Sequence, residues 1–81
     1  MFIPMLDAKI VGEAIYEIRK QKGVSQEVLS GLADIGRTHL SAFERGERKP
    51  TLETFYKLCY ALETDMSEVC KKIELKLKKQ G

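Results

Sequence analysis

The stretch "SQEVLSGLADIGRTHLSAFERG", residues 25–46, contains two short helical patterns separated by a break. Ser25 supplies an N-cap for one short helix, and the apolar spacing predicts another over residues 37–44; these are the second and third helices of the chain. Between them, Asp34 tolerates a left-handed backbone, and Gly36 starts the next helix without a side-chain cap. Both helices are too short to be stable alone, so they must share a core with other elements. Two short helices joined by a tight turn form a helix-turn-helix.

Three further helical patterns flank this pair. Apolar residues recur at helical spacing between Asp7, which suits an N-cap, and Gly23, which suits a helix end. Pro50 prevents the chain from resuming a helix at once, and Thr51 then caps a fourth helix. A last helix is expected over about residues 66–79. No segment alternates like a strand, so the sequence predicts an all-α fold of five helices.

Length and composition favour one compact domain. A chain of 81 residues has room for one modest core. Its 43% hydrophobic and 32% charged residues are typical of a globular protein and not of a disordered one. We expect a single domain over residues 1–81, with a core over about 8–63 and the C-terminal helix of about 66–79 beside it.

Several classes of function find no support in the sequence. One histidine and two cysteines are too few for a zinc site, so we expect no metal and no cofactor. Neither catalytic-triad spacing nor a nucleotide-binding loop is present, and we expect no enzymatic activity. The lack of a signal peptide and of a membrane-crossing stretch predicts a cytoplasmic protein without a membrane partner. In that compartment Cys59 and Cys70 are expected to be reduced, buried thiols.

The helix over residues 37–44 has two chemically different sides. Leu40 and Phe43 form an apolar side, and Thr38 and Ala42 point directly away from it. A helix that enters the major groove of DNA needs a small or polar outer side, an apolar underside and basic groups beside it. The pattern alone fits DNA contact and a merely solvated helix face equally well.

Basic residues gather around this helix. The net charge of +2 is too small to indicate nucleic-acid binding by itself. Residues 37–49, however, hold four basic groups against two glutamates. Arg37, in the first turn, has the reach and the forked donors to bind a guanine edge or a phosphate. The N-terminus of the helix adds its own partial positive charge.

A wider stretch of the sequence resembles a known family. "VSQEVLSGLADIGRTHLSAFERGERKP", extended back to "IRKQKG" and on to "TLETFYKLCYAL", is similar to the Cro and lambda-repressor type of helix-turn-helix regulator. The resemblance covers Val11 to about Val69. It implies a five-helix lambda-repressor-like fold and a sequence-specific DNA-binding transcriptional regulator. Proteins of this length in the family include restriction-modification controllers, phage-type repressors and element regulators.

The resemblance also implies roles for individual residues. Base edges would be read by residues of the third helix: Arg37, Thr38, His39, Ser41 and Ala42. The DNA backbone would be held by residues at the start of the second helix and after the third: Gln26, Arg45, Arg48 and Lys49. Arg19 and Glu44 would form an ion pair between the first and third helices. Ala42 offers only a methyl group, which suits a thymine methyl and leaves Arg37 to carry much of the base reading.

The last helix suggests self-association. Its apolar residues Val69, Ile73 and Leu77 are expected to have little left to cover once the other helices have packed. Such a stripe usually finds a partner, so we expect a homodimer through this helix, helped by the apolar arm of residues 1–6. Two recognition helices about 34 Å apart would then read an inverted-repeat operator on double-stranded DNA.

A different class of function fits the same residues. The chain would then be an antitoxin or another protein-interaction module, whose main role is to bind a partner protein.

The three tyrosines, Tyr16, Tyr56 and Tyr60, are expected to pack in the core or at its rim, because they are not interleaved with the basic residues.

Overall fold

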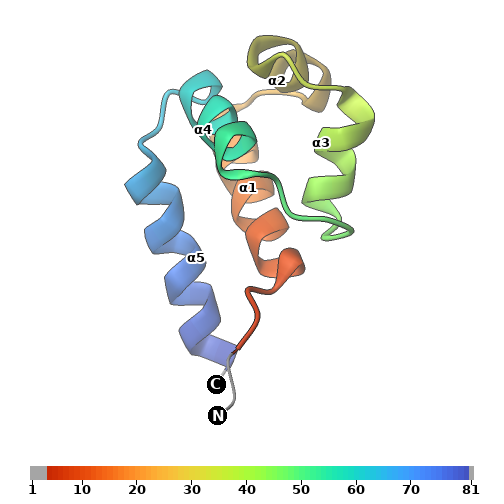
Figure 1. Ribbon diagram of the computed structural model, residues 1–81. Helices are drawn as coiled ribbons and strands as arrows, with labels where there is room; N and C mark the ends of the chain where they lie inside the picture. Colours follow the sequence, from red (N-terminus) through yellow and green to blue (C-terminus); the bar gives the residue numbers. More distant parts are fainter. Residues whose placement is uncertain (1–3, 81) are drawn as a thin grey trace.

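The computed structural model describes residues 4–80, which form five α-helices and no strand. Their bounds are α1 (Ala8–Lys22), α2 (Gln26–Ala33), α3 (Arg37–Glu44), α4 (Leu52–Ala61) and α5 (Met66–Gln80). Figure 1 shows α1 in the middle, with α5 along one side, α3 along the other, and α2 and α4 across one end. The all-α, five-helix prediction is confirmed, and the second helix-turn-helix element begins and ends at the predicted residues.

The helix ends are fixed by the side chains that the sequence indicates. Asp7 accepts a hydrogen bond from the backbone N–H of Lys9 at 2.9 Å, and Ser25 accepts one from that of Val28 at 3.1 Å. In the tight turn, Asp34 has a left-handed backbone with φ 55°, and Gly36 starts α3 without a side-chain cap. These caps satisfy backbone N–H groups that have no partner inside a helix.

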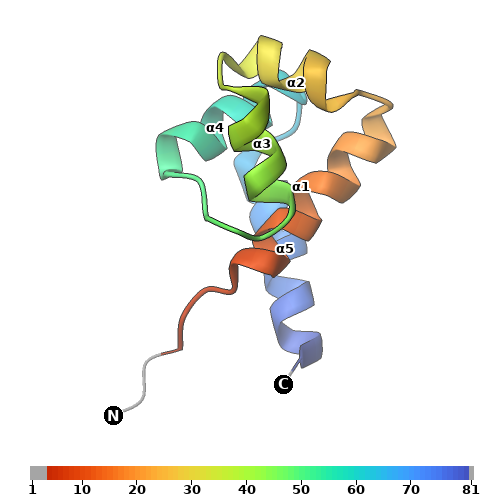
Figure 2. The same cartoon turned by 90° about the vertical axis from the view of Figure 1, so that its right-hand side faces the viewer.

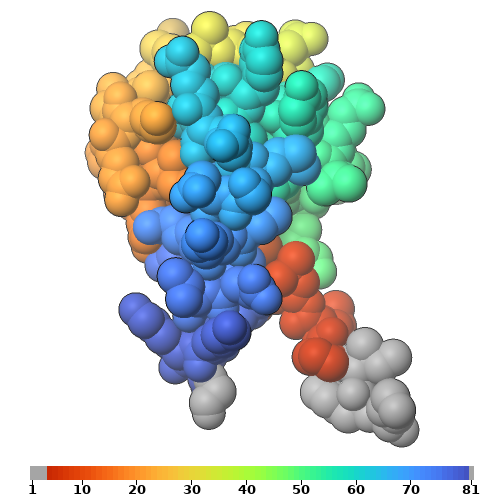
Figure 3. Space-filling model, turned by 90° about the vertical axis from the view of Figure 1, so that its left-hand side faces the viewer, coloured from red at the N-terminus to blue at the C-terminus, as the bar shows by residue number. Residues whose placement is uncertain are grey.

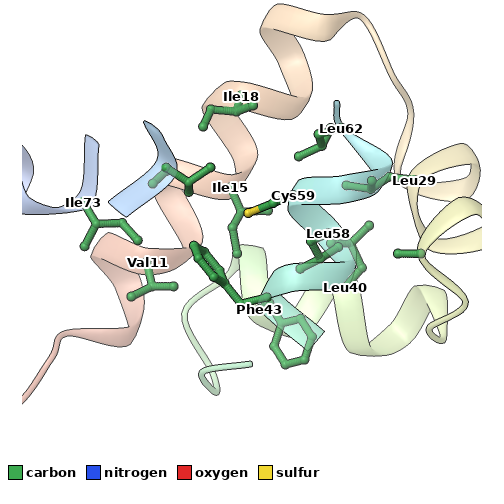
Figure 4. Close-up of a cluster of buried hydrophobic side chains, with 14 of the residues drawn as sticks. Val11, Ile15, Ile18, Leu29, Leu40, Phe43, Leu58, Cys59, Leu62 and Ile73 are labelled. Carbon is green, nitrogen blue, oxygen red and sulfur yellow. The ribbon is translucent and has the colours of Figure 1, made fainter. Parts of the chain in front are cut away.

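One continuous hydrophobic core joins all five helices (Figure 4). Helix α1 packs against α3 and α5, and α2 packs against α3 and α4. The largest side chains that are fully buried come one from each of the five helices: Ile15, Leu29, Leu40, Leu58 and Val69. Because α2 and α3 contribute so few core residues each, their positions depend on α1 and α4.

Helices α1 and α3 cross in close contact at Gly12. A Cβ atom at Gly12 would lie 2.2 Å from the carbonyl oxygen of Phe43 and 2.8 Å from that of Glu44. No side chain fits in that space. The backbone of α1 therefore supports the last turn of α3 directly.

Helix α5 packs more completely than the sequence suggests. Val69 and Ile73 are buried against the core, and Leu77 is half-buried against it. Ion pairs strengthen this contact, since Glu17 on α1 lies 2.9 Å from Lys72 and 2.6 Å from Lys76. The expectation that Val69 and Ile73 have little left to cover is wrong, because both are buried in the core of the single chain, where α5 packs against α1 and α4.

Two other expectations for the periphery also differ from the structure. Cys59 is buried, but Cys70 on α5 is exposed, so it is not the second core thiol. Burial raises the pKa of the Cys59 thiol to about 11. Tyr16 and Tyr56 lie at the rim, whereas Tyr60 is 75% exposed and does not pack into the core.

Within residues 4–80, no helix is long and apolar enough to cross a membrane.

Candidate nucleic-acid interface

Helix α3 presents its polar side to solvent. Leu40 and Phe43 are buried, and Arg37, Thr38 and His39 are exposed. Figure 2 shows α3 at the front of the molecule, with no other helix across its outer face. A helix held in this way can enter a groove about 12 Å wide without moving the rest of the fold.

Ser41 and Ala42, the other two candidate base contacts, are half-buried. The Ser41 hydroxyl accepts a hydrogen bond from Nη1 of Arg45, one turn further along the chain. Because that bond uses the oxygen as an acceptor, the hydroxyl hydrogen of Ser41 remains available to donate. Ala42 offers a methyl group and permits close approach.

A buried network fixes the orientation of α3. The guanidinium of Arg19 donates to both carboxylate oxygens of Glu44, at 2.7 Å and 2.9 Å, and to the carbonyl of Val24 at 2.9 Å. Gln26 donates from Nε2 to the same carboxylate at 2.9 Å. The ion pair implied by the resemblance is thus present, with side chains only 8% and 4% exposed.

Charge and hydrogen bonding hold the Arg19–Glu44 network in one arrangement. The hydrogen bond and charge of Glu44 raise the pKa of Arg19, whose guanidinium stays charged at any ordinary pH. The bidentate geometry and the extra bonds from Gln26 and to Val24 satisfy groups that would otherwise be costly to bury. Helices α1, α2 and α3 are therefore joined at one point.

The residues predicted to contact the DNA backbone differ in their exposure and in their partners within the protein. Gln26 is half-buried at the start of α2, with its amide N–H on Glu44. Arg45 is exposed and forms a bidentate pair with Glu47, at 2.7 Å and 3.1 Å. That pairing raises the pKa of Arg45 and lowers the pKa of Glu47. In the free protein, then, the Arg45 guanidinium already has an anionic partner.

Arg48 and Lys49 lie in the connection between α3 and α4 and are both exposed. The Lys49 ammonium donates to the backbone carbonyl of Leu6 at 3.0 Å, which ties this connection to the N-terminal arm. An ammonium has three donors, so this bond leaves two for an anion.

The structure adds one residue that the sequence reasoning missed. A surface hollow of about 430 Å³ lies between the end of α1 and the starts of α2 and α3. Lys20 and Arg37 line it from opposite sides, together with Ser25 and Gln26. The sequence places Lys20 in the last turn of α1, close to the N-cap of α2, but only the fold shows that it lines the same hollow as Arg37.

Comparison with known proteins identifies this architecture. Residues 15–69 match the helix-turn-helix family. The HTH-type transcriptional regulator y4dJ of Sinorhizobium fredii is 39% identical over 54 residues, which are 67% of this chain and 70% of that protein. The control protein C.SmaI of Serratia marcescens is 33% identical over 75 residues, which are 91% of this chain and 89% of that protein.

Among solved structures, the restriction-modification controller protein C.AhdI of Aeromonas hydrophila is similar to this chain with a TM-score of 0.76 and 34% identity. The match covers 80% of this chain and 98% of that one. On the family match and on these relatives, the chain belongs to the helix-turn-helix family of the Cro and lambda-repressor type.

Proposed function

We propose that this protein is a transcriptional regulator that binds an inverted-repeat operator as a homodimer, with α3 of each copy in a major groove. The observation that carries the proposal is the division of α3 into two faces. Leu40 and Phe43 anchor it in the core, while Arg37, Thr38 and His39 are left exposed. The network of Arg19, Glu44 and Gln26 holds that outer face in one orientation, as base reading requires.

In this proposal, some residues contact base edges and others contact the phosphate backbone. Arg37 offers a bidentate donor for a guanine edge, and Ala42 offers a methyl contact for thymine. Arg48 and Lys49 neutralise phosphates beside the groove and set the register of the protein on the duplex. The hollow between Lys20 and Arg37 offers a further place for a backbone phosphate.

The class of regulator that we favour is a controller protein of a restriction-modification system. The proposal is supported by C.AhdI, which is described as a restriction-modification controller protein, and by C.SmaI, which is described as a control protein; both are matched over most of their own length. In this proposal the protein is a cytoplasmic DNA-binding protein without catalytic activity. Its occupancy of the operator then depends on its own concentration.

The test is a binding selection from random duplex DNA with the purified protein at two salt concentrations. We expect enrichment of an inverted repeat whose half-sites lie about one helical turn apart. Enrichment of no sequence, with binding to every duplex that disappears at the higher salt concentration, would refute sequence-specific regulation.

One observation favours a second candidate, a protein-interaction module. Leu32, Tyr56 and Tyr60 are exposed around a hollow of about 470 Å³ between α2 and α4. The two tyrosine rings lie 6.3 Å apart. Exposed aromatic and apolar side chains gathered in one place are typical of protein-binding surfaces. Failure of the DNA selection, together with co-purification of a second chain, would favour this candidate.

A further inference from the structure

An exposed ion pair follows the last turn of α3. Arg45 donates from Nε to one carboxylate oxygen of Glu47 at 2.7 Å and from Nη2 to the other at 3.1 Å. The two side chains are 55% and 57% exposed. The same guanidinium donates from Nη1 to the hydroxyl of Ser41. Arg45 is therefore held between a serine of α3 and a carboxylate that follows this helix.

The turn after α3 fixes the position of Glu47. Gly46 has a left-handed backbone with φ 75°. Its N–H donates to the Phe43 carbonyl at 3.0 Å, and the Glu47 N–H donates to the Ala42 carbonyl at 3.0 Å. These two bonds form the common glycine-terminated end of an α-helix. A Cβ atom at Gly46 would lie 2.7 Å from Cα of Lys9, so the turn packs directly on the start of α1. The fold thus holds the backbone of Glu47 beside Arg45.

Glu47 is the exposed anion among the cations next to α3. Residues 37–49 contain two glutamates. The side chain of Glu44 is only 4% exposed, and its charge is neutralised by α1 inside the protein. Glu47 is exposed, as are the three cations around it, Arg45, Arg48 and Lys49. A polyanion that approaches this segment meets three cations and one anion, and the anion is already bound to one of the cations.

The carboxylate of Glu47 occupies the part of Arg45 that a phosphate would use. A guanidinium binds carboxylates and phosphates through the same planar fork of N–H groups. The Nε and Nη2 atoms of Arg45 form such a fork, and both donate to Glu47. A phosphate that binds this fork must therefore displace the carboxylate.

The exposure of the pair allows this displacement. Water screens the charges of exposed ion pairs, which change an equilibrium about fivefold or less. A DNA phosphate can replace so weak a partner, but the bond lost to Glu47 offsets part of the bond gained. The net effect is a weaker contact between Arg45 and DNA than a free arginine would make.

We propose that Glu47 competes with the DNA backbone for Arg45 and so limits the affinity of this protein for duplex DNA of any sequence. The inference rests on the proposed function, because it takes Arg45 as a residue that contacts a backbone phosphate. An arginine that binds a phosphate ordinarily releases a counterion from DNA. Here the displaced Glu47 takes up a cation in return, so Arg45 adds little to the salt dependence of binding.

Glu47→Gln tests the competition, and Glu74→Gln is its matched control. Each change removes one negative charge from an exposed side chain and keeps its length. Glu74 lies on α5, which faces the viewer of Figure 3, opposite to the α3 face of Figure 2. At low salt concentration, we expect Glu47→Gln to bind a random-sequence duplex about threefold more tightly per bound copy than Glu74→Gln. Equal affinities for the two variants would overturn the proposal.

The salt dependence of binding gives a second readout. In Glu47→Gln, Arg45 releases a counterion from DNA and no carboxylate takes up a cation. We expect the slope of log affinity against log salt to become steeper by about one for each bound copy. A slope equal to that of wild type would show that Arg45 gains no phosphate contact, and would overturn the proposal.

A double variant shows whether Glu47 acts through Arg45. Arg45→Met removes the guanidinium, so in that background Glu47→Gln changes only the net charge. We expect its gain in affinity to fall to that of Glu74→Gln. An equal gain with and without the guanidinium would mean that Glu47 merely repels DNA, and the competition would be refuted.

The competition and the proposed function fail in distinguishable ways. If wild type selects an inverted repeat but Glu47→Gln and Glu74→Gln bind random duplexes alike, the competition is wrong and the function stands. If wild type selects no sequence but Glu47→Gln tightens binding to random duplexes through Arg45, the competition stands and sequence-specific regulation is wrong. If neither wild type nor Glu47→Gln binds any duplex at low salt concentration, both are wrong.

Discussion

Gln26 donates from Nε2 to Oε1 of Glu44 at 2.9 Å, which joins the first residue of α2 to the last residue of α3. The same carboxylate oxygen accepts a bond from Nη2 of Arg19 at 2.9 Å. Three helices therefore share one buried acceptor. The relative orientation of the two helices of the helix-turn-helix depends on that acceptor as well as on apolar packing.

Breaking this pair should destabilise the fold strongly. Arg19→Met keeps the length of the side chain but leaves the Glu44 carboxylate buried without its cation, which typically costs roughly 3–5 kcal/mol of unfolding free energy. The matched control is Arg45→Met, because Arg45 forms an ion pair of similar geometry that is more than half exposed. Chemical denaturation should show a large loss for Arg19→Met and almost none for Arg45→Met. Similar losses for both would contradict the structural role of the buried pair.

The crossing of α1 and α3 makes a second prediction about stability. Gly12→Ala places a Cβ atom against the backbone oxygens of Phe43 and Glu44, and overpacking of this kind costs about 1–3 kcal/mol. Gly31→Ala is the control, since nothing lies within 4 Å of a Cβ atom there. In the interior of α2 that change should stabilise the protein by about 1 kcal/mol. Thermal unfolding should show a lower melting temperature for Gly12→Ala and a higher one for Gly31→Ala. An unchanged melting temperature for Gly12→Ala would refute the close crossing.

Arg37 is expected to determine sequence preference. Arg37→Ala should cost about 1–3 kcal/mol of operator binding and relax the preference at one position in each half-site. Binding to a set of operators with single substitutions measures both effects. Lys20→Ala, on the other side of the same hollow, should weaken binding to all of these operators equally. If Arg37→Ala left the sequence preference unchanged, the assignment of α3 as the helix that reads the bases would be wrong.

Lys49 is expected to contribute affinity without preference. Lys49→Ala should weaken binding to specific and random duplexes alike and reduce the slope of log affinity against log salt by about one. Lys79→Ala, an exposed lysine at the end of α5, is the control and should leave the slope unchanged. Titrations at four or more salt concentrations give the slope. If Lys49→Ala and Lys79→Ala had the same slope of log affinity against log salt, the effect would come from the net charge of the protein and not from a phosphate contact of Lys49.

The contact between α1 and α5 should weaken in acid. Hydrogen bonds from Lys76 and Lys72 lower the pKa of Glu17 below its ordinary value of 4.5. Because the carboxyl pKa is lower in the folded state, its contribution is complete above pH 4.5 and is lost as the pH falls through the lowered pKa. Glu17→Gln should remove this part of the acid dependence of the unfolding free energy. Glu74→Gln, exposed on α5 and without an ion pair to residues 4–80, should not.

Local signals in the sequence were sufficient for the helices and their ends. Asp7, Ser25 and Thr51 were recognised as caps because each carries a short side-chain acceptor next to an apolar helical pattern. Asp34 was placed in a left-handed turn because few residue types tolerate that conformation. The polar outer side of α3 followed from helical periodicity alone.

Features that depend on distant parts of the chain were not visible in the pattern. A helical wheel shows that Val69 and Ile73 share a face, but it does not show that α1 and α4 pack against α5 and bury that face. The same applies to the exposure of Cys70 on α5, and to Lys20, which lines the same hollow as Arg37 only in the folded chain. The family resemblance supplied the pairing of Arg19 with Glu44, which no local signal connects.

The division of α3 into an anchored side and an exposed side has a consequence for evolution. Arg37, Thr38 and His39 are exposed, while Leu40 and Phe43 hold the helix in the core. Exposed substitutions away from structural contacts usually change stability little. Mutation can therefore alter the three outer residues at small cost to folding. Under the proposed function, proteins with this scaffold can diverge in the DNA they recognise while keeping the same core.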